Sequence, residues 1–152
     1  MRAREADAGG LFAHRYAIGR ELGRGGMGAV HQATDTLGGR ELAIKRLLQR
    51  PKDQALALAL FEREFHVLSQ LAHPRVVEVL DYGVSEETPF YTMELLDGGD
   101  LAGMAPMPWR DVCRVFRDVF SVLALLHSRR MVYRDLNPNN IRCTAEGTAR
   151  VI

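Results

Sequence analysis

Short stretches of strand-forming residues, bounded by turn residues, occupy much of the first half of the chain. Two of them flank a glycine-rich loop, a third follows a turn at 35–39, and two more surround a turn at 85–89. The pattern predicts five antiparallel strands, at residues 16–22, 29–34, 41–47, 76–83 and 90–94.

Two longer segments instead repeat their apolar residues at helical spacing. The first, at 54–71, ends before His73-Pro74 and has apolar residues on the i, i+3, i+4 and i+7 rows: Leu60, Phe61, Phe65, Leu68 and Leu71. The second, at 109–127, has one apolar face: Val112, Val115, Phe116, Val119, Leu123 and Leu126. Its other face is polar: Arg114, Arg117, Asp118 and Ser121. The second helix therefore needs an apolar partner.

The remaining segments suggest how the chain is organised. Residues 1–13 offer nothing periodic to bury and are expected to form a flexible lead-in. The glycine-ended segment at 95–100 is typical of a linker and predicts two lobes, at 14–94 and 101–152. Short strands are predicted at 131–132, 141–143 and 149–152, around a loop that contains Pro138 and a turn at 145–147.

Composition narrows the possible functions. The chain has 152 residues, 47% hydrophobic and 26% charged, which is typical of a globular protein. A formal net charge of +1 gives no general attraction to nucleic acid or to an anionic membrane, so phosphate binding would have to be local. Cys113 and Cys143, without metal-ligand spacing, predict no zinc site or disulfide framework. The amino terminus lacks an apolar run, so a cytoplasmic location is expected.

The glycine-rich loop has the spacing Gly23-x-Gly25-x-x-Gly28. Such a motif also opens Rossmann dinucleotide sites, where it leads from a strand into a helix. Here residues 29–34 contain few strong helix formers and end in a turn, which favours a strand after the loop. A hairpin of this kind can bring backbone N–H groups close to phosphate oxygens.

Lys45 lies in the third predicted strand, where an isolated lysine would ordinarily face solvent. Glu64 shares a helical row with apolar residues, where an unpaired carboxylate is costly, so it is the expected partner of Lys45. Glu62 is the alternative partner, but its row on the helix is more polar.

Asp135 and Asn140 lie five residues apart in a loop interrupted by Pro138. These residue types also form and cap turns, so a purely structural role is the alternative to a catalytic one. In phosphoryl transfer, the same spacing supplies a carboxylate that accepts or orients a hydroxyl proton and an amide oxygen that binds Mg²⁺.

The order of the glycine loop, the Leu42-Ala43-Ile44-Lys45 strand and the Tyr133-Arg134-Asp135 loop resembles that of the eukaryotic-type protein kinases. The sequence of the glycine loop is most similar to that of bacterial serine/threonine kinases, and the resemblance covers residues 16–152. It implies an α+β protein-kinase-like fold, with a five-stranded antiparallel sheet and one helix in the first lobe. The helical second lobe would be incomplete, because the Asp-Phe-Gly motif expected after Ile152 is absent.

The resemblance also implies roles for individual residues. ATP and Mg²⁺ would be the cofactors, with Asp135, Lys45 and Glu64 as catalytic residues and Asn140 as a metal ligand. The glycine loop would cover the phosphates through Gly23, Gly25 and Gly28. The remaining nucleotide contacts would come from Leu22, Val30, Ala43, Met93, Glu94, Leu96, Asp100 and Arg142.

Several features favour an alternative, a catalytically inactive pseudokinase-like module that binds nucleotide or another protein. Asn137 replaces a lysine and Arg142 an apolar residue of the family pattern. The segment between Gly99 and Pro108 is too short for the usual first helix of the second lobe. The 152-residue chain alone is expected to bind nucleotide weakly, to transfer little phosphate, and to self-associate through an exposed face of the 109–127 helix.

A small-molecule phosphotransferase shares the Asp-x-x-x-x-Asn loop, but Arg134 and the three-glycine loop argue against it. The predicted partners are therefore ATP and a protein substrate with Ser or Thr, with no nucleic acid or membrane.

Overall fold

The computed structural model describes residues 10–25, 28–48, 54–133, 136–144 and 146–152. The chain divides into two compact units. The first comprises Met1–Val67 and Val79–Leu95, and the second comprises Leu68–Glu78 and Leu96–Ile152. The division after Leu95 lies in the predicted linker. The segment Leu68–Glu78, expected in the first lobe, instead belongs to the second unit.

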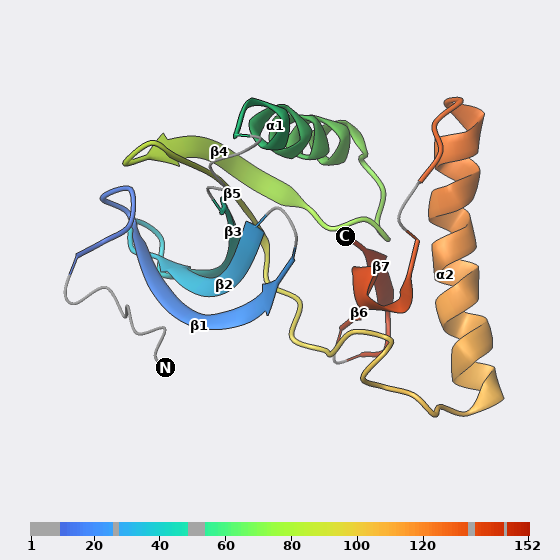
Figure 1. Cartoon of the computed structure of the whole chain (residues 1–152). Coiled ribbons are helices and arrows are strands. Elements are labelled where there is room, and N and C mark those ends of the chain that lie inside the picture. The colour runs from blue at the N-terminus through green and yellow to red at the C-terminus, as the bar shows by residue number, and fades with distance from the viewer. Residues whose placement is uncertain (1–9, 26–27, 49–53, 134–135, 145) are drawn as a thin grey trace. The chain divides into compact units, whose positions relative to one another are not determined.

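The first unit contains the predicted antiparallel sheet (Figure 1). Its five strands are ordered β1-β2-β3-β5-β4 in space, so β5 separates β3 from β4. The strands are β1 (Tyr16–Arg24), β2 (Gly28–Asp35), β3 (Arg40–Leu47), β4 (Val79–Ser85) and β5 (Thr88–Glu94). The predicted strand number, direction and α+β class are confirmed. The main difference is β4, which begins at Val79 because Val76 and Val77 pair with the carboxyl-terminal strand of the second unit.

The strand register separates the side chains of the first unit into two sets. Residues directly opposite on antiparallel strands project from the same face of a sheet. Val30, Lys45 and Tyr91 form one row across β2, β3 and β5, and Ala43 lies opposite Met93 in the next row. The other face carries a buried hydrophobic cluster: Tyr16, Ala33, Leu42, Ile44 and Phe90.

Phe12 covers part of this cluster, although it belongs to the segment expected to be a loose lead-in. Its ring centroid lies 5.0 Å from that of Phe90 in an edge-on arrangement, and the Arg46 guanidinium lies over its ring. An isolated aromatic residue has no periodicity, so this contact has no signal in the sequence pattern.

Helix α1 (Gln54–Gln70) lies along the sheet, beside β4 and β5 (Figure 1). Phe61 is fully buried against Tyr91, and Phe65 packs between the rings of Tyr82 and Tyr91. Leu60 was expected on the buried rows but is 41% exposed. The aromatic rings of the sheet accommodate Phe61 and Phe65, and Leu60 lies outside this contact.

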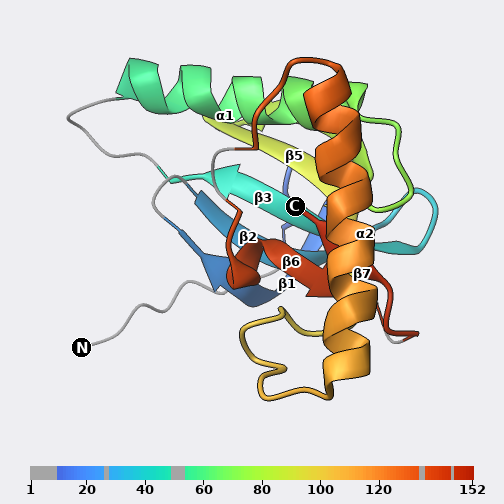
Figure 2. The ribbon, with the colours of Figure 1, turned by 90° about the vertical axis from the view of Figure 1, so that its right-hand side faces the viewer.

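The second unit is built on α2 (Trp109–Ser128) and a hairpin of β6 (Ile141–Cys143) and β7 (Ala149–Val151) (Figure 2). A short 3₁₀ helix, η1 (Pro138–Asn140), leads into β6. The predicted strands at 141–143 and 149–152 are therefore found, but the strand predicted at 131–132 was wrong. These residues have no regular structure, and Val132 is 72% exposed. None of the described helices is long and apolar enough to cross a membrane.

The buried face of α2 differs from the predicted one. Four apolar residues are buried in this helix: Val115, Val119, Val122 and Leu126. Phe116, predicted on the buried face, is 41% exposed, whereas Asp118, predicted on the polar face, is 5% exposed. Asp118 lies on the same i, i+3, i+4, i+7 rows as the buried valines, and its burial depends on partners outside the helix.

Candidate nucleotide and catalytic site

An ion pair between β3 and α1 is the central feature of the candidate site in the first unit. Lys45 Nζ lies 2.5 Å from Glu64 Oε1, with the two side chains 19% and 27% exposed. Partly buried charges of this kind are tolerated when they are paired. Glu62, the alternative partner, instead accepts a hydrogen bond from the Tyr82 hydroxyl at 3.2 Å. The structure therefore pairs Lys45 with Glu64 and not with Glu62.

A third residue, Tyr91, joins this pair and was not anticipated from the sequence. Its hydroxyl donates to the same Glu64 oxygen at 2.6 Å. Tyr91 lies opposite Lys45 in the pairing of β3 with β5. The sequence pattern does not give this register, so it could not predict the contact. The carboxylate thus receives hydrogen bonds from an ammonium and from a phenol.

An apolar surface adjoins the ion pair on the same face of the sheet. Val30 lies directly opposite Lys45, and Ala43 lies directly opposite Met93, which is buried. Leu22 is half-buried in β1, next to an irregularity in the strand pairing between Glu21 and Gly23. The structure thus brings together three residues predicted to contact adenine and the predicted phosphate-binding lysine.

The glycine loop closes a hairpin between β1 and β2, which confirms the strand alternative over a Rossmann helix. The Gly25 N–H donates to the Gly28 carbonyl at 2.9 Å. At Gly28 a Cβ would lie 2.6 Å from the Arg46 carbonyl oxygen, so the tight pairing with β3 requires glycine there. Among the described residues, no atom outside the neighbouring positions lies within 4 Å of a Cβ placed on Gly23 or Gly25, so there is space beside this part of the loop.

Four residues predicted for the site lie in the described part of the second unit: Leu96, Asp100, Asn140 and Arg142. Asp100 forms a β-bridge with Arg142, and its Oδ1 accepts the Gly103 N–H at 2.8 Å. Asn140 ends η1, and its carbonyl accepts the Ile152 N–H at 3.0 Å. Leu96 is half-buried at the start of a segment of this unit. Asp135 lies outside the described residues.

The segment after Leu96 packs closely against β6. The Cys143 N–H donates to the Gly99 carbonyl at 3.0 Å. A Cβ on Gly98 would lie only 1.9 Å from the Cys143 carbonyl oxygen, so no other residue fits without a backbone shift. The second glycine of the predicted linker, Gly99, has no such constraint, since its nearest atom is 3.9 Å away.

The first unit contains groups that suit a nucleotide: an ammonium, the glycine loop and an apolar surface. The second unit contains the amide side chain of Asn140. An ammonium suits phosphate oxygens, and an amide oxygen suits Mg²⁺.

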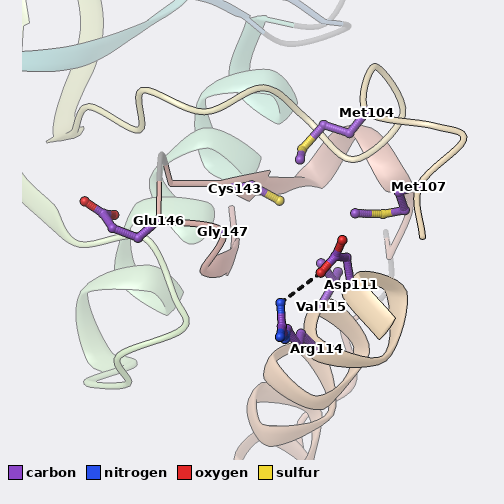
Figure 3. Close-up of a pocket in the computed structure, with 8 residues that line it drawn as sticks. All are labelled: Met104, Met107, Asp111, Arg114, Val115, Cys143, Glu146 and Gly147. Atoms are coloured by element: carbon purple, nitrogen blue, oxygen red, sulfur yellow. Dashed lines mark hydrogen bonds and ion pairs between the residues drawn. The ribbon is translucent and has the colours of Figure 1, made fainter. Parts of the chain in front are cut away.

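A separate pocket of about 310 Å³ lies within the second unit (Figure 3). It is lined by Met104, Met107, Asp111, Arg114, Val115, Cys143, Glu146 and Gly147. Arg114 and Asp111 form an ion pair at 2.9 Å beside it, and burial raises the pKa of the Cys143 thiol. None of the residues predicted to bind nucleotide lines this pocket.

Comparisons with known proteins agree with this geometry. The family model described as "Protein kinase domain" matches residues 16–152. The chain is 36% identical over 148 residues to the probable serine/threonine-protein kinase PknB of Lactococcus lactis, covering 94% of this chain and 24% of that protein. It is also 36% identical over 151 residues to the DNA damage-responsive serine/threonine-protein kinase RqkA of Deinococcus radiodurans, covering 95% and 22%. The chain thus spans about a quarter of the length of these curated relatives. It belongs to the protein kinase family and resembles its bacterial serine/threonine kinases.

Proposed function

We propose that this chain provides the nucleotide-binding part of an ATP-dependent serine/threonine protein kinase. The reaction would transfer a phosphoryl group from ATP to a protein hydroxyl. The observation that carries the proposal is the Lys45–Glu64 ion pair, on the same face of the sheet as Val30, Ala43 and Met93.

In this proposal the ion pair orients Lys45 toward the nucleotide phosphates. A partly buried carboxylate restrains the ammonium, and a restrained cation binds phosphate at a smaller entropic cost than a freely rotating one. The glycine loop would cover the same phosphates, and the described residues leave space for a ligand at the Cβ positions of Gly23 and Gly25.

The apolar row beside Lys45 is assigned to the adenine ring. Leu22, Val30, Ala43 and Met93 would contact its faces and edge. The backbones of Glu94 and Leu96 would form hydrogen bonds with it, Asp100 would contact the ribose, and the Arg142 guanidinium would stack on the base.

Asp135 and Asn140 complete the proposed chemistry. The Asp135 carboxylate would accept or orient the proton of the substrate hydroxyl, and the Asn140 amide oxygen would hold Mg²⁺. Bound Mg²⁺ would neutralise charge on the phosphates during transfer. A cytoplasmic location, where ATP is available, belongs to the same proposal.

A second candidate function is a non-catalytic module that binds nucleotide or another protein. Arg142 favours it, because this charged side chain lies in β6, where the family pattern has an apolar residue. Asn137 favours it too, because it stands where the family pattern has a lysine. Its side chain instead caps η1 by accepting the Asn139 N–H at 3.0 Å.

Isothermal titration calorimetry of the purified chain with ATP, with and without Mg²⁺, tests the proposed function. We expect binding that Lys45→Met and Glu64→Gln each weaken about tenfold, because each removes a charge-assisted contact. The matched control is Glu62→Gln on the same helix, which leaves the Lys45 pair intact and should change the affinity less than about twofold, because Glu62 makes no contact with Lys45.

Absence of ATP binding by the unsubstituted chain, or equal effects of Glu64→Gln and Glu62→Gln, would contradict the proposed function. Binding that is indifferent to Mg²⁺ would favour the non-catalytic module. Any phosphoryl transfer that the chain does show separates the two further: in a kinase, Asp135→Asn removes the proton acceptor and should abolish that transfer while leaving ATP binding unchanged.

A further inference from the structure

Tyr91 occupies an unusual position beside the Lys45–Glu64 ion pair. It lies directly opposite Lys45 in the β3–β5 pairing and is 1% exposed. Its ring packs against Phe61 and Phe65 of α1, with centroid distances of 5.1 Å and 5.8 Å. The ring is therefore fixed between the sheet and the helix that carries Glu64.

The hydroxyl of Tyr91 makes a specific polar contact from this position. A buried phenol requires a hydrogen-bond partner, and this one donates to Glu64 Oε1 at 2.6 Å. The Lys45 ammonium donates to the same oxygen at 2.5 Å, and Lys45 Nζ lies 5.8 Å from the centroid of the Tyr91 ring. Tyr91 thus contacts both members of the ion pair.

A second tyrosine on the sheet shows that packing alone does not require this contact. Tyr82 also packs against Phe65 of α1, and its hydroxyl donates to Glu62 at 3.2 Å. That bond is longer, and Glu62 is not paired with Lys45. Two tyrosine–glutamate bonds thus join the described parts of the sheet and the helix, and one of them involves the ion pair.

We propose that Tyr91 is a positioning residue whose hydroxyl holds the Glu64 carboxylate in place for Lys45. This inference rests on the proposed function, because it gives Tyr91 a part in nucleotide binding. When Lys45 shares its ammonium between Glu64 and nucleotide phosphates, its hold on the carboxylate weakens. The Tyr91 hydroxyl then keeps Glu64, and with it α1, against the sheet.

The first test needs no nucleotide. Tyr91→Phe keeps the packed ring and removes only the hydroxyl, and its effect on urea unfolding is measured with Lys45 and in the Lys45→Met background. We expect a larger drop in the unfolding midpoint in the Lys45→Met background, because Glu64 has by then lost the ammonium. Tyr82→Phe is the matched control, and its effect should be the same in both backgrounds.

The second test measures function. We expect Tyr91→Phe to weaken ATP binding in calorimetry and to slow covalent labelling of Lys45 by an amine-reactive ATP analogue, each by about tenfold, the usual effect of a hydrogen bond to a charged group. Tyr82→Phe should change neither measurement, although it removes the same chemical group from the same sheet.

The outcomes distinguish this inference from the proposed function. If the unsubstituted chain binds no ATP, the proposed function fails, and the positioning role in nucleotide binding fails with it; the unfolding experiment still decides whether Tyr91 restrains Glu64. If ATP binds and Tyr91→Phe behaves as Tyr82→Phe does in both tests, the positioning role is overturned while the proposed function stands.

Discussion

His31 is a buried ionisable residue on the face of the sheet opposite Lys45, and it is surrounded by charge. It is 8% exposed, its Nε2 lies 3.4 Å from the Arg46 guanidinium and 3.7 Å from Glu21, and Glu21 in turn pairs with Arg24. Burial, followed by Arg46, lowers the pKa of His31. The native state therefore favours the neutral imidazole.

This lowered pKa predicts a pH dependence of stability. The unfolded chain binds the proton at about pH 6.5 and the native state only at lower pH, so the free energy of unfolding should fall as pH drops below about 6.5. The loss ends at the lowered native pKa. We expect His31→Gln to remove this part of the pH dependence, measured by urea unfolding at several pH values between about 7 and 5.

The control is His14→Gln, at an exposed histidine. Its free energy of unfolding should vary with pH as that of the unsubstituted chain does. Identical slopes for His31→Gln and the unchanged chain would contradict the assignment of the neutral form to the native state.

At the scale of elements, one buried acid of α2, Asp118, contacts two other segments of the second unit. Asp118 Oδ2 accepts the Ala149 N–H of β7 at 3.2 Å. Its Oδ1 lies 3.4 Å from Arg75 Nε, in the segment that follows α1, and 3.4 Å from Arg117. One carboxylate therefore joins α2, β7 and the Leu68–Glu78 segment.

We expect Asp118→Ala to lower the free energy of unfolding by about 2–4 kcal/mol, because it leaves a buried N–H and a partly buried guanidinium without their acceptor. Urea unfolding measures the change. Asp111→Ala, which removes an exposed acid paired with Arg114 on the same helix, should cost less than about 1 kcal/mol. Similar costs for the two variants would show that the contacts of Asp118 do not hold this unit together.

At the scale of the whole molecule, α2 presents a second apolar surface in addition to its buried face. Trp109, Phe116 and Phe120 are 70%, 41% and 58% exposed, and the rings of Phe116 and Phe120 are in contact. Their spacing of seven and four residues places them on one side of the helix. Of the apolar face predicted to need a partner, Phe116 is thus part of the exposed surface, whereas Val115, Val119 and Leu126 are buried.

We propose that the isolated chain self-associates through these aromatic side chains, because a continuous exposed apolar patch favours association. Phe120→Ser should lower the weight-average mass at high protein concentration in sedimentation equilibrium. The association constant should fall at least about tenfold, because burial of a Phe side chain contributes about 1.5–3 kcal/mol. Leu37→Ser is the control, since Leu37 is 79% exposed in a turn and outside the aromatic patch. A monomer at all concentrations, or equal effects of both changes, would contradict this.

Local pattern and motif order were sufficient to predict much of this protein. The strands, both long helices and the choice of Glu64 over Glu62 followed from periodicity, since the residues that decide them lie within one helix or one strand pair. The order of the glycine loop, Lys45 and the 133–140 loop likewise indicated the kinase family, because motif order is a property of the sequence itself.

Tertiary structure alone decided the contacts between distant segments. Tyr91 reaches Glu64 only through the pairing of β5 with β3, and Asp118 is buried only because Ala149 and Arg75 surround it. A periodic pattern shows which side chains are apolar. It does not show which distant hydrogen-bond donor contacts a given polar side chain. Register and packing determine those donors, and for this reason Asp118 was predicted on the wrong face and Tyr91 was overlooked.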